Sequence, residues 1–126
     1  RIRRGQQQGA SDYIDLLDAR ARLISVAERR LAPYDAWLMP SVAIVAPQVE
    51  PLDADDATFF ATNGLVLRNA SVINFLDGCA LSLPCQGKGE LPVGLSICGL
   101  NGTDARILSI GGGATEVMLD EAAKRY

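Results

Sequence analysis

The sequence of 126 residues carries 12 lysine and arginine residues, 15 aspartate and glutamate residues and no histidine, with 48% hydrophobic residues and a net charge of −3. That length makes about one small domain. Outside Arg1, Arg3 and Arg4 there is no basic patch, which argues against a nucleic-acid partner. No uncharged apolar run approaches the roughly 20 residues of a membrane span, so we expect no membrane partner. We expect a cytoplasmic protein whose three cysteines, Cys79, Cys85 and Cys98, are reduced structural thiols without metal-ligand spacing.

The first part of the chain predicts one long helix and one short strand. Residues 1–10 are typical of a loop or a cut end. Ser11 or Asp12 is a suitable N-cap for a helix that runs to Leu31. Residues 36–39 form a short buried strand that ends at Pro40, and the proline-containing stretch after it is an irregular crossing. One face of the helix is broadly apolar and holds Tyr13, Ile14, Leu17, Ala21, Ile24 and Leu31.

The middle of the chain predicts two short helices and then two strands. Asn63-Gly64 interrupts the strongly apolar segment 57–77 and indicates a break between two helices, and Asp77-Gly78 ends the second helix. Residues 79–83, the run CALSL, are apolar nearly throughout, as is typical of a central strand that is buried on both faces. Residues 92–98 alternate between larger apolar and small residues, which predicts a second strand.

The last predicted element is a helix from Thr103 or Asp104 to Arg125. It contains the three glycines at positions 111–113, which cost roughly 1 kcal/mol each in a helix relative to alanine. A phosphate-binding loop would need a strand before them and a Gly-Lys-Ser/Thr sequence after them, and both are missing. Close helix packing, a kink or plain tolerance explains them better. The residues expected to face inward are Ile107, Leu108, Ile110, Ala114, Val117 and Met118.

The residues that could carry out catalysis are few. The absence of histidine excludes Ser-His-Asp and Cys-His catalysis and the usual zinc hydrolase sites. No two serines are adjacent, and neither Lys88 nor Lys124 lies near a glycine- and serine-rich run. We therefore predict no catalytic residue, no metal site and no cofactor in this chain.

An ordered set of short motifs runs from Arg68 to Gly99. Asn74 stands six residues after Arg68, followed by the G-x-A-x-S-x-P-C motif that ends at Cys85 and then by Leu-Pro-Val-Gly-Leu, which ends at Leu95. This order resembles the C-terminal part of amidase signature enzymes. Earlier residues extend the resemblance over nearly the whole chain; they are Tyr13, Arg20, Asp35, Leu38, Pro40, Ala46 and Pro47.

The resemblance implies an α/β fold in which strands of a large mixed sheet are flanked by helices. Residues 1–126 would be the C-terminal segment of one incomplete amidase signature domain. The family's Lys–cis-Ser–Ser triad lies in the N-terminal part, which this chain lacks. The complete enzyme would hydrolyse C–N bonds of a small-molecule amide. The expected partners of this chain are the missing N-terminal part of the same protein or further copies of itself.

The resemblance places Arg68 and Asn74 nearest the substrate pocket, as substrate-binding residues. The alternative for these two residues is structural: Asn74 would tie a loop to backbone groups, and Arg68 would form an ion pair. The alternative for the whole chain is a stand-alone, non-catalytic module with an amidase-like fold that serves in binding or dimerisation.

Overall fold

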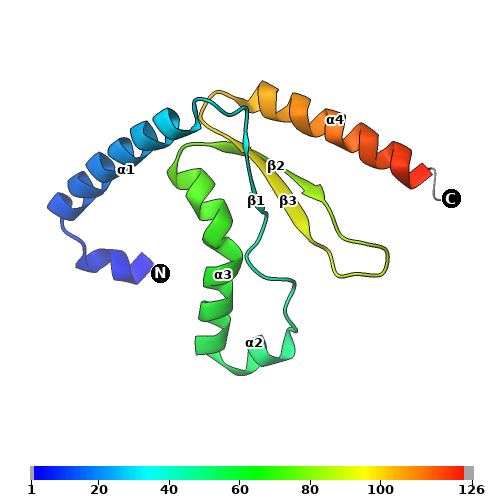
Figure 1. The fold of residues 1–126 in the computed structure, drawn as a ribbon. Coiled ribbons are helices and arrows are strands. Elements are labelled where there is room, and N and C mark those ends of the chain that lie inside the picture. Colours follow the sequence, from blue (N-terminus) through cyan, green and yellow to red (C-terminus); the bar gives the residue numbers. More distant parts are fainter. Residues whose placement is uncertain (1, 124–126) are drawn as a thin grey trace.

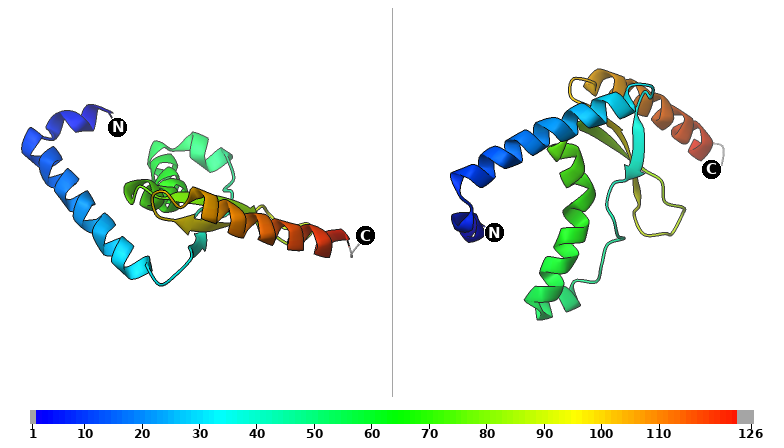
Figure 2. Two further views of the ribbon diagram at one scale, coloured as in Figure 1. Left: turned by 90° about the horizontal axis from the view of Figure 1, so that it is seen from above. Right: turned by 60° about the vertical axis from the view of Figure 1, so that its left-hand side comes forward.

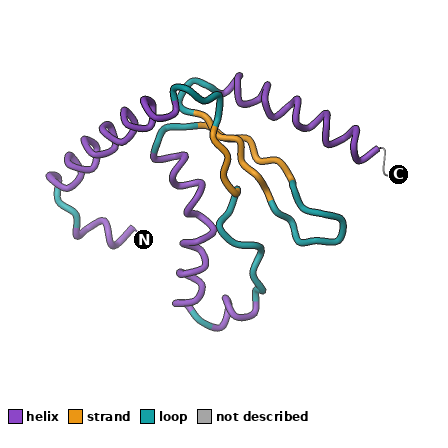
Figure 3. Tube along the Cα trace, in the orientation of Figure 1, coloured by secondary structure: helices purple, strands orange, loops and turns teal. Residues whose placement is uncertain are grey.

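A computed structural model describes residues 2–123 of the protein, with side chains over 5–113. Helices and strands follow one another in the order η1 (Ile2–Gln7), α1 (Ala10–Leu31), β1 (Trp37–Pro40), α2 (Glu50–Ala54), α3 (Asp56–Phe75), β2 (Cys79–Pro84), β3 (Gly94–Gly99) and α4 (Asp104–Ala123). The three strands lie together at the centre, and α1, α3 and α4 extend from them in different directions (Figures 1 and 3). The fold is therefore a mixed α and β fold. None of the helices within residues 2–123 combines the length and the apolar character needed to span a bilayer.

The sheet is antiparallel, with the strand order β1-β3-β2. Leu81 of β2 pairs with Ile97 of β3, and Leu38 of β1 pairs with the same Ile97 from the other side. The expectation that 79–83 is the central strand is wrong within this chain, because β3 holds the centre and β2 forms an edge. The expected burial of β2 on both faces is also wrong, because its residues alternate between half-buried and exposed, with Ala80 and Ser82 exposed. The strand β1, predicted to be buried, alternates in the same way. An apolar run does not fix the place of a strand in its sheet, because that place depends on the elements that pack on and beside it.

One face of the sheet is covered by α4. Gly111 of α4 lies so close to Leu81 that a Cβ atom at position 111 would meet the leucine side chain. Ile107 packs over Gly99 in the same way and is almost fully buried. The glycine at position 111 therefore permits close helix packing, as the sequence suggested. Within residues 5–113, the buried apolar residues come from α3, β3 and α4; they are Ile73, Ile97, Cys98 and Ile107.

Helix α1 begins and ends close to the predicted residues, but its cap differs. Gly9 is the N-cap, and the backbone N–H of Gly9 donates to Asp12 Oδ2 at 2.8 Å, so Asp12 occupies the third helical position. None of the 22 residues of α1 is buried. The apolar face predicted for this helix exists, but most of it lies open to solvent.

Helix α3 runs without a break, so the predicted interruption at Asn63-Gly64 is wrong. Position 64 has open space around it, and a single glycine costs only about 1 kcal/mol inside a helix. Asp55 caps the start of α3 by accepting the backbone N–H of Thr58 at 2.8 Å, and hydrogen bonds from Thr58 lower the pKa of the Asp55 carboxyl group. The predicted end at Asp77-Gly78 is confirmed: Asp77 has a φ of 58°, and the N–H of Gly78 donates to the carbonyl of Ile73 at 2.9 Å.

The structure differs from the predictions made from the sequence in three further features. The first residues include the 3-10 helix η1, and the crossing after β1 includes the short helix α2. Leu108 was expected to face inward but is 61% exposed, because α4 turns that side away from the sheet. The side chains of Ala114, Val117 and Met118 and the predicted end at Arg125 lie outside the part of the chain whose details are described.

The protein exposes more surface than a compact monomer of its size. Its accessible surface is 9611 Å², whereas a folded monomer of 13.4 kDa exposes about 6,500 Å². Large apolar residues contribute to the excess throughout α3, where they surround the helix; those at least 40% exposed are Phe59, Phe60, Leu65, Leu67 and Val72. A helix that is apolar all round is typical of a buried position in a larger protein.

The three glycines of α4 give a stability test with an internal control. Position 112 has open space around it, so Gly112→Ala should raise the free energy of unfolding by up to about 1 kcal/mol through helix propensity. Gly111→Ala places a methyl group against Leu81, and we expect this variant to be about 1–3 kcal/mol less stable than Gly112→Ala. Urea unfolding followed by the fluorescence of Trp37 measures both. Equal stability of the two variants would show that α4 does not pack closely on β2.

Candidate functional site

Three serine hydroxyl groups from separate parts of the chain meet on one face of the sheet. Ser41 follows β1, Ser82 lies in β2 and Ser96 lies in β3. Ser41 Oγ is hydrogen-bonded to Ser82 Oγ and lies 2.8 Å from Ser96 Oγ. Ser96 is buried, whereas Ser82 is exposed, so the serine cluster reaches from the interior of the sheet to its surface.

The missing side chain at Gly94 allows this cluster to form. A Cβ atom at position 94 would lie 2.7 Å from both Ser41 Oγ and Ser82 Oγ. The backbone N–H of Ser41 also donates to the carbonyl of Gly94 at 2.8 Å, which continues the β1–β3 pairing by one residue. Beside Gly94 lies an open hollow of about 200 Å³, between residues 42–45 and residues 92–94.

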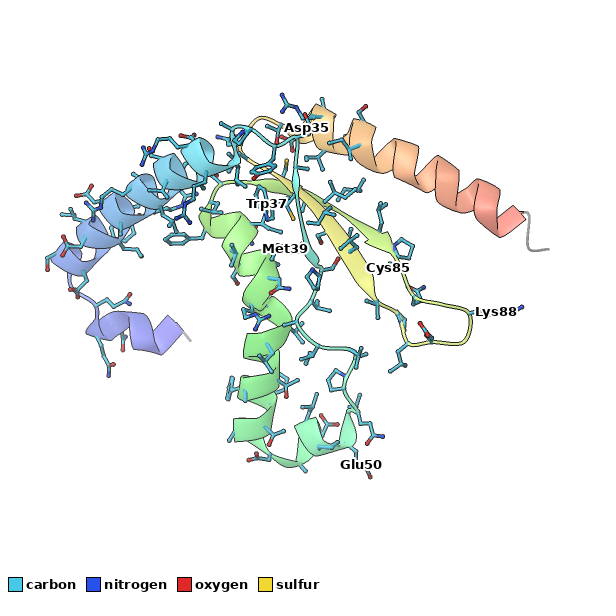
Figure 4. The ribbon with its side chains drawn as sticks, viewed as in Figure 1. Asp35, Trp37, Met39, Glu50, Cys85 and Lys88 are labelled. Atoms are coloured by element: carbon cyan, nitrogen blue, oxygen red, sulfur yellow. The ribbon has the colours of Figure 1, made fainter. Side chains whose placement is uncertain are left out.

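The serine cluster can exchange hydrogen bonds, but the described residues place no histidine or lysine beside it to act as the base that nucleophilic catalysis requires. A serine becomes a nucleophile when a neighbouring group accepts its proton. The sequence contains no histidine, and Lys88 points outward from the tip of the β2–β3 loop (Figure 4). Lys124 lies outside the described residues. The hydroxyl groups are therefore suited to binding a polar group or to holding the strand ends together.

Asn69 of α3 ties the helix to the strand that leads into this cluster. Its side-chain Nδ2 donates to the carbonyl of Pro40 at 2.7 Å, and its Oδ1 accepts from Arg68 Nε at 3.2 Å. Only 6% of Asn69 is exposed. The motifs of the sequence did not indicate Asn69, although a polar residue within an apolar helix is a signal that could have done so.

The two predicted site residues, Arg68 and Asn74, are not brought together. They lie six residues apart in α3, which separates them by about 9 Å along the axis and about 120° around it. Arg68 is exposed and reaches the end of β1 through Asn69. Asn74 is exposed, and its backbone carbonyl accepts the N–H of Asp77. The loop-tying role considered for Asn74 belongs to Asn69, and Arg68 forms no ion pair with any residue of the described part of the chain.

A polar joint instead fixes α1 against the end of α3. Arg20 Nε donates to the carbonyl of Phe75 at 2.9 Å, and Arg20 Nη2 lies 3.3 Å from Asp77 Oδ1. The other carboxylate oxygen of Asp77 accepts from Asn101 Nδ2 at 3.1 Å. The joint therefore links α1, the turn after α3 and the turn that leads into α4.

The cysteines are free and differ in their surroundings. Cys85 is exposed, Cys79 is half-buried and Cys98 is fully buried. Burial, with a smaller contribution from Cys79, raises the pKa of the Cys98 thiol to about 11. Among the residues that the structure describes, no group of three or more cysteine, aspartate or glutamate side chains is placed to hold a metal ion.

Comparison with known proteins gives a distant relative. Over 81 residues, 64% of this chain, the sequence is 30% identical to a curated protein of Rhodococcus erythropolis named "Uncharacterized protein in nthA 5'region". The chain spans 41% of the length of that relative. No family model matches the chain, and no solved structure matches it.

The contrast between two asparagines in α3 provides a test of the site. Asn69→Ala removes the donor to the carbonyl of Pro40 and leaves that acceptor without its partner, so we expect a loss of about 1–3 kcal/mol in unfolding free energy. Asn74→Ala changes an exposed side chain in the same helix and should cost less than about 0.5 kcal/mol. Urea unfolding measures both variants. A larger loss for Asn74→Ala would contradict this assignment.

The buried thiol predicts a pH dependence of stability. The pKa of Cys98 rises from 9.0 to about 11 on folding, so the folded protein keeps this proton where the unfolded chain has lost it. This contribution to stability is complete below about pH 9 and is lost as the pH rises towards about 11. Unfolding free energies measured across that range should therefore fall more steeply for the wild type than for Cys98→Ala. Parallel curves would show that Cys98 is not shielded from water.

Proposed function

We propose that this chain is the C-terminal portion of an amidase that hydrolyses C–N amide bonds of a small-molecule substrate. It contributes part of a larger sheet and part of the substrate pocket, and it lacks catalytic residues of its own. Its partner is an N-terminal amidase segment that carries the lysine and the two serines of the family's triad. The three free cysteines agree with the reducing conditions of the cytoplasm, where we place the enzyme.

The observation that carries the assignment is the order of motifs between Arg68 and Gly99. Each motif is short, but their sequence and spacing follow the C-terminal part of amidase signature enzymes. In this proposal Arg68 and Asn74 contact the substrate, and neither forms part of the proton relay. The exposed position of both residues agrees with such a role, because an interior tie would bury them.

The large exposed surface supports the view that another protein segment covers this chain. The accessible surface exceeds that of a compact monomer by about 3,000 Å², and α3 exposes large apolar side chains such as Phe60 and Val72 on more than one side. Both β1 and β2 leave one edge without a partner strand within residues 2–123. In the proposed enzyme, the N-terminal segment supplies further strands at these edges and covers α3.

Co-expression with an N-terminal amidase signature segment tests the proposal. The chain alone should release no ammonia from acetamide or benzamide, because a base and an activated serine are missing. Affinity purification should recover a complex of the two segments, and that complex should release ammonia. Arg68→Ala in the complex should reduce kcat/KM by about tenfold or more, as the loss of a charged substrate contact does.

The control replaces the nucleophilic serine of the N-terminal segment by alanine, which should abolish activity while the complex still forms. Turnover by the isolated chain that survives repurification would contradict the proposal. Failure of the two segments to associate, or an inactive complex, would favour the alternative of a non-catalytic binding or dimerisation module.

A further inference from the structure

The hydrogen bonds of the serine cluster have one favoured direction. Ser41 Oγ lies between Ser82 Oγ and Ser96 Oγ, and because a hydroxyl group has a single proton, Ser41 donates to one neighbour and accepts from the other. Ser96 is only 5% exposed, and in the described part of the chain Ser41 is the one hydrogen-bond partner of its hydroxyl group. If Ser41 donated to Ser96, the proton of Ser96 would be buried without an acceptor, which is costly. Ser96 therefore donates to Ser41, and Ser41 donates to Ser82.

This direction leaves the proton of Ser82 free at the surface of the sheet, in the part of the molecule where β1 ends (Figures 1 and 2). Ser82 is exposed and its oxygen accepts from Ser41, so its own O–H group is available to a ligand. Hydrogen bonds in a chain polarise one another, which makes the last hydroxyl group a better donor than an isolated serine. The cluster consists of uncharged groups, so a neutral carbonyl oxygen suits it better than a carboxylate, which loses more hydration free energy on binding.

The backbone that carries Ser41 is held in place before a ligand arrives. The carbonyl of Pro40 accepts from Asn69 Nδ2 at 2.7 Å, and the N–H of Ser41 donates to the carbonyl of Gly94 at 2.8 Å. The peptide group between Pro40 and Ser41 is therefore fixed on both sides, by α3 and by β3. A donor that is positioned in this way loses little conformational entropy when it binds a ligand.

Gly94 borders both the serine cluster and the open hollow of about 200 Å³, whose other lining residues, 42–45 and 92–93, are all apolar. Pockets for drug-sized ligands measure about 300–1,000 Å³, so this hollow takes a short apolar group. We propose that the end of β1 binds a small aliphatic amide, whose carbonyl oxygen accepts from the Ser82 hydroxyl group and whose alkyl group lies in the hollow. This inference deepens the proposed function, on which the choice of an amide among neutral carbonyl compounds rests.

Titration of the isolated chain with isobutyramide, followed by the backbone amide signals in nuclear magnetic resonance spectra, tests the site. The signals of Ser41, Ser82 and Gly94 should shift with one dissociation constant in the millimolar range, as is usual for so small a ligand. Ser82→Ala should weaken binding about fivefold through the loss of one hydrogen bond, and Ser82→Thr, which keeps the hydroxyl group, should bind like the wild type. The matched control, Ser25→Ala, removes an exposed hydroxyl group from α1 and should have no effect.

The isolated chain suffices for this titration, so its failure and the failure of the proposed function are distinguishable. An isolated chain that does not bind isobutyramide overturns this inference and leaves the activity of the co-expressed complex unaffected. An inactive complex contradicts the proposed function, while binding of isobutyramide at the end of β1 still supports this site.

Two further ligands with the same alkyl group test the direction of the hydrogen bonds. Isobutylammonium offers only donors and isobutyrate carries a charge, so each should bind at least about fivefold more weakly than isobutyramide. Gly94→Ala places a Cβ atom 2.7 Å from both Ser41 Oγ and Ser82 Oγ and should weaken binding at least as much as Ser82→Ala, with circular dichroism confirming the fold. The proposal is overturned if isobutylammonium or isobutyrate binds as tightly as the amide, or if Ser82→Ala binds the amide like the wild type.

Discussion

The pairing of β3 with a strand on each of its sides is the interaction on which the rest of the structure depends. It brings β1 and β2 together although 38 residues separate the end of β1 from the start of β2. The paired strands present Ile97 and Leu81 to α4, whose Gly111 and Ile107 approach the sheet closely. The same pairing places Ser41 and Ser82 on either side of Gly94. Beyond this centre, α1 and much of α3 are held mainly by polar contacts at their ends.

The sequence predicted the elements that local signals define. The helix over α1, both strands after α3 and the turn at Asp77-Gly78 follow from periodicity and turn chemistry. The break at Asn63-Gly64 was predicted wrongly because a turn signal is weaker than the helical hydrogen-bond ladder on both sides of it. The central place assigned to 79–83 was wrong for a different reason: strand order depends on which partner strands are present, and residues 2–123 supply one partner for β2.

The candidate site could be predicted only in part, because its contacts join distant residues. Ser41 and Ser96 are 55 positions apart, and Asn69 lies 29 positions from Pro40. A pattern of neighbouring residues in the sequence does not indicate contacts between residues this far apart. The motif order indicated Arg68, whose side chain is hydrogen-bonded to Asn69, and Asn69 in turn binds the carbonyl of Pro40 at the end of β1. The motif order could not show that Asn69 is the buried residue of the two. Because Asn69 ties α3 to the end of β1, the exposed side chain of Arg68 is available to bind a ligand.

The central claim is that β3 and its neighbours form a small closed core, while α1 and most of α3 need another surface to be stable. Amide hydrogen exchange on the full chain at low micromolar concentration tests this claim most directly. The account predicts slowest exchange in β3 and in the turns of α3 and α4 around Ile73 and Ile107, with fast exchange in α1. Equal protection of α1 and β3 would show that the single chain closes its own core, and would contradict the account.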